Sequence, residues 1–136
     1  MINRFALFFA LVLLIPSLQA IQLTEFFKES EFSDRYTGEH GIKLAFVKRL
    51  NILREKCGFE FIITSGYRTR NHPVEKIKQT IGTHTLGIAA DIRVANGYQR
   101  RCIVEGALRM GFRGIGVHNN FIHIDMRKGP TVIWAY

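Results

Sequence analysis

The sequence predicts an α+β fold: a small, mainly antiparallel sheet with helices packed on one face. Three observations predict it. Two segments with helical periodicity, residues 42–57 and 98–111, alternate with short segments rich in β-forming residues. Two further β-type segments within residues 114–127 are separated only by a short polar turn, as in a hairpin. A chain of 136 residues has room for one such domain.

The first twenty residues, MINRFALFFALVLLIPSLQA, have the features of a secretory signal peptide. Arg4 precedes an apolar run over residues 5–15, and Ala20 is a small residue suited to a cleavage site. The run is shorter than the roughly 20 residues that cross a bilayer. Because Leu18 fits the cleavage rule poorly, an uncleaved membrane anchor is the alternative. In either case we expect an exported protein, periplasmic or secreted, with one domain over residues 21–136.

The exported domain is basic. The whole chain has a formal net charge of +8, and residues 1–20 contain one charged side chain, Arg4, so that +7 remains. This charge favours an anionic partner such as a cell-wall polymer. The basic residues are scattered and form no recognisable nucleic-acid-reading motif, so we expect no nucleic-acid partner.

The first half of the domain predicts an N-terminal arm, a helix, a strand and a loop. Residues 23–40 mix short helical patterns with turn residues and predict a packed arm. Residues 42–57 carry apolar side chains every three or four positions, which predicts an amphipathic helix ended by Gly58. Residues 59–64 predict a strand. Residues 67–83 are polar, and we expect an ordered loop with one helical turn. Loops of this length in a small domain are usually functional or disordered.

The second half predicts a strand over residues 87–94 and a helix over residues 98–111, ended by Gly111. The chain has two cysteines, Cys57 and Cys102, each in a predicted helix. In an exported chain they can form a disulfide or remain as buried thiols, and the sequence leaves both open. The chain has no CxxC pair, which argues against zinc binding by cysteines.

The C-terminal residues predict a hairpin and a last strand. We expect the hairpin, residues 114–127, to turn at residues 118–120, because the asparagines there tolerate the positive φ of tight turns. Residues 131–136 predict a short strand. We assign its Trp134 and Tyr136 to the core, with a platform for the substrate as the alternative.

Strand parity predicts a sheet face that carries ionisable side chains. Successive side chains of a strand point to opposite faces. In the segment FIHIDM the isoleucines face one way, and His123 and Asp125 face the other. In the segment IAADIRV, Asp91 lies opposite the apolar residues. If these strands are neighbours, Asp91 and His123 share a face, and a turn at Gly87 brings His84 to it.

Two histidines and an aspartate on one face suit a zinc ion. Three protein ligands leave one coordination position for water, which is typical of a catalytic site. Zinc lowers the pKa of bound water to about 7 and polarises a carbonyl, so hydrolysis becomes possible at neutral pH. In the alternative interpretation, each histidine is only hydrogen-bonded and the aspartate is only ion-paired. The candidate ligands of one Zn²⁺ are His84, Asp91 and His123.

Three motifs, in this order along the chain, resemble a known enzyme family: SGYRTR, THTLGIAADI and GIGVHNNFIHIDMR. The chain resembles the zinc D-alanyl-D-alanine carboxypeptidases and the L-alanyl-D-glutamate endopeptidases. Their wider group includes lysostaphin-type peptidases and the hedgehog signalling domain. The resemblance covers residues 22–136. It implies the fold of that group and hydrolysis of peptide bonds in peptidoglycan stem peptides with one Zn²⁺.

The resemblance also implies roles for single residues. The metal ligands it implies are His84, Asp91 and His123. Arg68, in the motif SGYR, would stabilise the oxyanion that forms as water attacks the carbonyl, because a guanidinium aimed at developing negative charge favours the transition state. The alternative is that Arg68 is an ordinary surface arginine without a catalytic role. Ser65 and Tyr67 flank Arg68 and are candidate substrate-binding residues, with packing as the alternative.

One position departs from the family pattern. Several branches of the family carry a glutamate or aspartate as general base three residues before the last ligand, where this chain has Asn120. We expect Asp125 to be the base instead, because it shares the face of His123 and lies about 6.6 Å along the strand. Two alternatives stay open. Asp125 orients the ligand histidine, or Asp125 binds the metal and His123 transfers the proton.

The leading hypothesis is therefore a monomeric, exported zinc peptidase that cuts peptidoglycan stem peptides, as a carboxypeptidase or an endopeptidase. We expect the protein to be attached to a membrane only if the N-terminal segment stays uncleaved. The alternative is a non-catalytic cell-wall-binding module that keeps the fold and the metal. Asn120, which stands where several branches of the family have an acidic general base, agrees with this alternative. The sequence leaves open which bond is cut, and whether the protein serves a bacterium or a phage.

Overall fold

The computed structural model describes residues 19–136. The predicted signal peptide lies outside the described residues, except for its last two positions. Within the described part of the chain, no helix is both long enough and apolar enough to cross a bilayer. The predicted N-terminal arm is present: it contains the short 3-10 helix η1 (Glu29–Phe32) and buries Phe27 and Phe32 completely.

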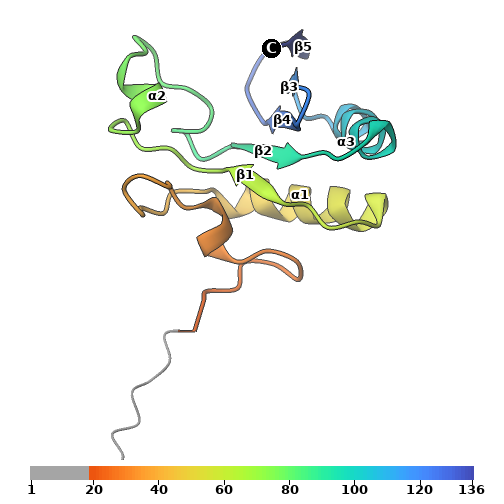
Figure 1. The fold of residues 1–136 in the computed structure, drawn as a ribbon, viewed down its shortest axis with the longest axis horizontal. Coiled ribbons are helices and arrows are strands. Elements are labelled where there is room, and N and C mark those ends of the chain that lie inside the picture. Colours follow the sequence, from red (N-terminus) through yellow and green to blue (C-terminus); the bar gives the residue numbers. More distant parts are fainter. Residues whose placement is uncertain (1–18) are drawn as a thin grey trace, which may run out of the picture.

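Five strands form one sheet in the order β1-β2-β4-β3-β5 (Figure 1). Every neighbouring pair is antiparallel except β3 and β5, which are parallel. This arrangement confirms the predicted α+β class with a mainly antiparallel sheet. The strands are β1 (Ile63–Ser65), β2 (Ala89–Arg93), β3 (Gly114–Val117), β4 (Phe121–Asp125) and β5 (Val132–Ala135).

Two long helices, α1 (Leu44–Cys57) and α3 (Gly97–Arg109), pack against each other and enclose the core with the sheet. Burying this apolar surface is the main source of stability for the domain. The two helices therefore lie on one face of the sheet, opposite the polar face. The side chains that meet in the core include Phe46, Val47, Leu50 and Leu53 from α1 and Ala90, Ile92, Ile122 and Ile124 from the sheet.

Both helices end as predicted. Gly58 adopts a φ of 72° after α1, and its backbone N–H donates to the carbonyl of Arg54. Gly111 adopts a φ of 75° after α3. Cys57 at the end of α1 is joined to Cys102 in α3 by a disulfide, so of the two open alternatives for the cysteines the structure has the bonded one.

Strand β1 is shorter than predicted. The sequence favoured a strand over residues 59–64, but regular pairing begins only at Ile63 and continues to Ser65. The register with β2 shifts between these two residues, which pair with Ile92 and Asp91. Phe61 is buried without being part of the strand, because it packs into the core from the preceding segment.

The hairpin of β3 and β4 turns at residues 118–120 as predicted, but without the predicted left-handed backbone. Among the described residues, only glycines have a positive φ. The backbone N–H of Asn120 instead donates to Nδ1 of His118, at 3.1 Å. The backbone N–H of His118 also donates to the carbonyl of Phe121, at 3.0 Å. The turn is therefore closed without the positive φ for which asparagine is favoured.

The assignment of Trp134 and Tyr136 to the core is wrong. Both lie on the polar face of the sheet, where the Trp134 ring packs against the ring of His123 at 5.2 Å between centroids. Tyr136 is 65% exposed. The physical reason is that β5 is an edge strand, whose apolar side chains need not face the helices.

Candidate metal centre

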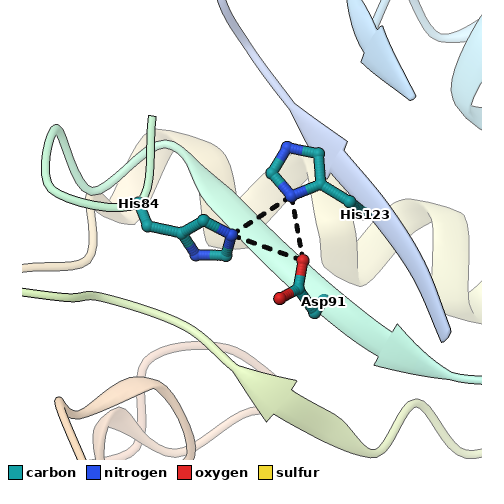
Figure 2. Close-up of side chains that lie close together, drawn as sticks. All are labelled: His84, Asp91 and His123. Atoms are coloured by element: carbon teal, nitrogen blue, oxygen red, sulfur yellow. Dashed lines mark hydrogen bonds and ion pairs between the residues drawn. The ribbon is translucent and has the colours of Figure 1, made fainter. Parts of the chain in front are cut away.

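The three predicted ligands converge on one point (Figure 2). Asp91 of β2 and His123 of β4 are paired residues of neighbouring antiparallel strands. Asp91 Oδ1 lies 2.9 Å from His123 Nδ1 and 3.3 Å from His84 Nε2, and the two histidine nitrogens are 3.1 Å apart. All three side chains are buried. The structure thus brings together the set that strand parity proposed.

His84 reaches the strands because the chain turns sharply at Gly87. Gly87 has a φ of 72°, and its N–H donates to the carbonyl of His84. A Cβ at this position would overlap the carbonyl oxygen of Gly41, so the turn requires glycine for two reasons. Nδ1 of His84 lies 2.6 Å from the carbonyl oxygen of Gly66 and donates to it. This bond fixes the ring and leaves Nε2 as the lone-pair donor that faces the other ligands.

The ring of His123 is fixed from its other side. Nε2 of His123 lies 2.9 Å from Oδ2 of Asp125, which is completely buried. Asp125 also accepts hydrogen bonds from the backbone and guanidinium of Arg127. Gly114 is the residue paired with Asp125 across the sheet, and a Cβ there would overlap the carboxylate. The space for Asp125 therefore exists because Gly114 has no side chain.

This donor set fits a zinc ion. Ligand atoms around tetrahedral zinc, bonded at about 2.0–2.1 Å, lie about 3.3 Å from one another, which is close to the separations in the cluster. Each histidine uses its second nitrogen for a carbonyl or carboxylate, as metal-bound histidines ordinarily do. A divalent cation would also stabilise the buried carboxylate of Asp91. The residues that would hold the ion are His84, Asp91 and His123.

The charge states of the cluster follow from burial and from its hydrogen bonds. Burial lowers the pKa of His84, which keeps the ring neutral and able to bind a metal. Burial also acts against the charged forms of Asp91 and His123. Hydrogen bonds with His123 and His84 outweigh it for Asp91 and lower its pKa. Hydrogen bonds with Asp125 and then Asp91 outweigh it for His123 and raise its pKa. A metal ion at Nδ1 of His123 would take the place of a proton there.

Arg68 is held by three acceptors. Its Nε donates to Oγ of Ser65 at 2.8 Å, its Nη2 to Oδ2 of Asp91 at 2.9 Å, and its Nη1 to Oε1 of Glu75 at 3.3 Å. A guanidinium has five N–H groups, so two remain free. The Arg68 side chain is only 16% exposed, yet it lines a groove of about 600 Å³ beside Asp91. Arg68 can thus donate hydrogen bonds to a molecule in this groove.

Of the two predicted substrate-binding residues, Ser65 lines this groove and Tyr67 does not. Ser65 accepts a hydrogen bond from Arg68. Tyr67 is half-buried, with its ring against Gly41. Asn120, at the position where relatives carry an acid, is exposed and lines the groove, as does the exposed Arg93. Two arginines, Arg68 and Arg93, therefore line the groove, which borders the metal-binding cluster at Asp91.

Sequence reasoning missed Glu75, Arg127 and the role of Gly114. The parity of β4 could have found Arg127, because it follows His123 and Asp125 on the same face. Parity also places Gly114 on this face, because it precedes the core residue Ile115, but it does not place Gly114 opposite Asp125. No local signal points to Glu75, which lies in the loop before β2.

A buried His/Asp/His cluster beside an open, basic groove is the arrangement of a metal-dependent hydrolase. The chain matches the family model described as Peptidase M15 over residues 21–125. This is more than half of its length, and the chain belongs to the peptidase M15 family, which confirms the predicted family and fold. The family consists of zinc enzymes that act in general on peptidoglycan peptides. No curated protein matches the chain significantly.

Proposed function

We propose that this protein is an exported zinc peptidase that hydrolyses peptide bonds in the stem peptides of peptidoglycan. The observation that carries the proposal is the convergence of His84, Asp91 and His123 next to the groove that Arg68 lines. All three metal donors come from one chain, so a monomer is sufficient for activity. The groove has two arginines, Arg68 and Arg93, which complement the carboxylates of a stem peptide.

A zinc ion held by the three donors would supply a Lewis acid that polarises the scissile carbonyl and activates water. The protein's own contribution is to place hydrogen-bond donors where negative charge develops. The two free N–H groups of Arg68 fit this role, since the guanidinium is already oriented by Ser65 and Asp91. Tyr67 and Ser65 stay candidates for contact with the substrate.

For Asp125 the contacts support an orienting role over the role of general base. Its carboxylate is completely buried, and its oxygens accept from His123 Nε2 and from Arg127. These bonds hold the pKa of Asp125 below its ordinary range, although burial acts in the opposite direction. A carboxylate that is occupied in this way fixes the imidazole of His123 and increases its strength as a ligand.

Hydrolysis is tested with purified protein and defined muropeptides, with the products identified by mass spectrometry. We expect zinc-dependent release of an amino acid or peptide, and its position identifies the bond that is cut. The His84→Ala variant should release nothing. Full activity after removal of zinc by a chelator would overturn the proposal. Binding to peptidoglycan without any cleavage would instead favour the non-catalytic module.

Export is supported by the N-terminal segment and by the disulfide between Cys57 and Cys102, because such bonds persist in oxidising compartments. Expression of the full chain followed by N-terminal sequencing tests it. We expect the exported product to begin at Ile21. An intact N-terminus in the membrane fraction would identify an anchored protein, and retention in the cytoplasm would overturn export.

A further inference from the structure

Glu75 is a completely buried carboxylate that the mechanism above does not use. It lies in α2 (Pro73–Lys76), the single helical turn within the loop of residues 67–83 (Figure 1). The start of α2 is fixed by His72, whose Nδ1 accepts a hydrogen bond from the N–H of Val74 at 3.2 Å. The loop thus places one negative charge at a defined position inside the protein.

The contacts of Glu75 are unequal. Oε1 accepts hydrogen bonds from Nζ of Lys78 at 2.9 Å and from Nη1 of Arg68 at 3.3 Å. Oε2 is buried and has no partner. A buried carboxylate is costly unless cations compensate it. The side chain of Lys78 is 40% exposed and that of Arg68 only 16%. Arg68 is therefore the cation that is largely buried beside Glu75.

Arg68 needs such a partner once the metal is bound. Asp91 uses Oδ2 for Arg68 and Oδ1 for the two histidines. A divalent cation at Oδ1 and the guanidinium at Oδ2 would repel each other across one carboxylate. Ser65 is uncharged and offers only one hydrogen bond. Glu75 is the negative charge that attracts the guanidinium from the side of Nη1, away from the metal donors.

We propose that Glu75 is a positioning residue that anchors Arg68 beside the metal centre, so that its free N–H groups stay directed to the developing oxyanion. The inference rests on the proposed function for its catalytic consequence. The anchoring itself is a property of the folded chain and can be measured without substrate or metal.

The direct test is nuclear magnetic resonance of the metal-free protein. When rotation about the Nε–Cζ bond is hindered, Nη1 and Nη2 of an arginine give separate signals. We expect separate signals for Arg68 in the wild type, identified by their loss in Arg68→Ala. Glu75→Gln keeps the shape of the side chain but removes its charge. Because Ser65 and Asp91 still hold Nε and Nη2, we expect faster rotation in this variant, seen as broadening and partial merging of the two signals. Unchanged, separate signals in Glu75→Gln would overturn the proposal.

Lys78→Gln is the matched control, because it removes the other partner of Glu75 and leaves Arg68 anchored. Merged signals in Lys78→Gln, to the same degree as in Glu75→Gln, would mean that the buried charge only supports the loop, and would overturn the proposal. If Glu75→Gln does not fold, Gly82→Ala serves instead. Its Cβ would lie 2.9 Å from Oε2 of Glu75 and displace the carboxylate without removing it.

Activity supplies the second readout. We expect Glu75→Gln to lower kcat by up to about 100-fold, with KM little changed, because the loss is one of orientation. The double variant Glu75→Gln with Arg68→Ala should have the same kcat as Arg68→Ala alone. If the two reductions of kcat instead multiply, the residues act independently and the proposal is overturned. If the wild type hydrolyses no stem peptide, the proposed function fails, while the metal-free spectra still decide whether Glu75 anchors Arg68.

Discussion

Asp91 and His123 are directly opposed residues of β2 and β4, and Oδ1 of Asp91 lies 2.9 Å from Nδ1 of His123. Two of the three donors thus come from neighbouring strands of the sheet, although these strands are far apart in the sequence. Because both strands are covered by helices on their other face, the pair is held rigidly. A site with such support binds its metal without a large rearrangement.

Zinc should stabilise the folded protein. At a free zinc concentration of 100 times the Kd, the free energy of unfolding should rise by about 2.7 kcal/mol. Calorimetry with and without zinc measures this as an increase in Tm. His84→Ala removes one of three donors and should abolish the increase, whereas His118→Ala, outside the cluster, should keep it. An equal increase in His84→Ala would contradict the assignment of the ligands.

Replacement of Asp125 distinguishes an orienting residue from a base. In Asp125→Asn the imidazole of His123 loses its charged partner, so we expect zinc affinity to fall by about 10–100-fold together with activity. Competition with a metal-binding dye measures the affinity. If Asp125 were the base, hydrolysis would be lost while zinc bound as tightly as before.

Gly114→Ala should disturb the same carboxylate from the neighbouring strand. The new Cβ would overlap Asp125, and the forced shift should cost about 1–3 kcal/mol of stability and weaken zinc binding. Gly97→Ala is the matched control, since nothing lies within 4 Å of its Cβ at the start of α3. Chemical denaturation and zinc titration of both variants test the pair, and equal effects would argue against a specific role for Gly114.

Asp34 should make stability depend on pH at the acid end. It is buried, and burial alone would raise the pKa of its carboxyl. Hydrogen bonds from the backbone N–H groups of Thr69, Tyr36 and Thr37 outweigh this and lower the pKa below its ordinary 3.8. The stabilisation is therefore complete above about pH 4 and is lost as the pH falls through the lower value of the folded state.

Asp34→Asn tests this expectation. The variant should lose about 1–3 kcal/mol at pH 7, because the amide accepts these bonds less strongly. Its stability should also vary less between pH 4 and the acid limit than that of the wild type. Equal pH profiles from urea unfolding would show that Asp34 does not carry the effect.

The disulfide should stabilise the helical layer and leave the metal centre unaffected. Cys57 and Cys102 join α1 to α3, on the opposite side of the sheet from His123. Removal of the bond should cost about 2–4 kcal/mol. The double variant Cys57→Ser with Cys102→Ser should therefore have a lower Tm but unchanged zinc affinity at a temperature where it is folded. A change in zinc affinity under those conditions would show that the two regions are coupled.

The helices, most of the sheet and the face that carries the site could be predicted from the sequence. These features follow from local periodicity: alternation in β2 and β4 separates Asp91 and His123 from the core, and Gly87 marks the turn that brings in His84. Such signals depend only on neighbours along the chain. They do not say which strands are adjacent. From the sequence, it is therefore an assumption that the strands of Asp91 and His123 are neighbours, and the structure shows that the two residues are paired.

The surroundings of the ligands depend on contacts between distant segments and could not be predicted in this way. Glu75 reaches Arg68 from a loop, Gly114 makes room for Asp125, and Trp134 packs on the polar face instead of in the core. The position of a loop side chain depends on packing between distant segments, and an apolar residue on an edge strand can be covered from either face. Local patterns contain neither kind of information, because both are set by contacts that form only when the whole chain folds.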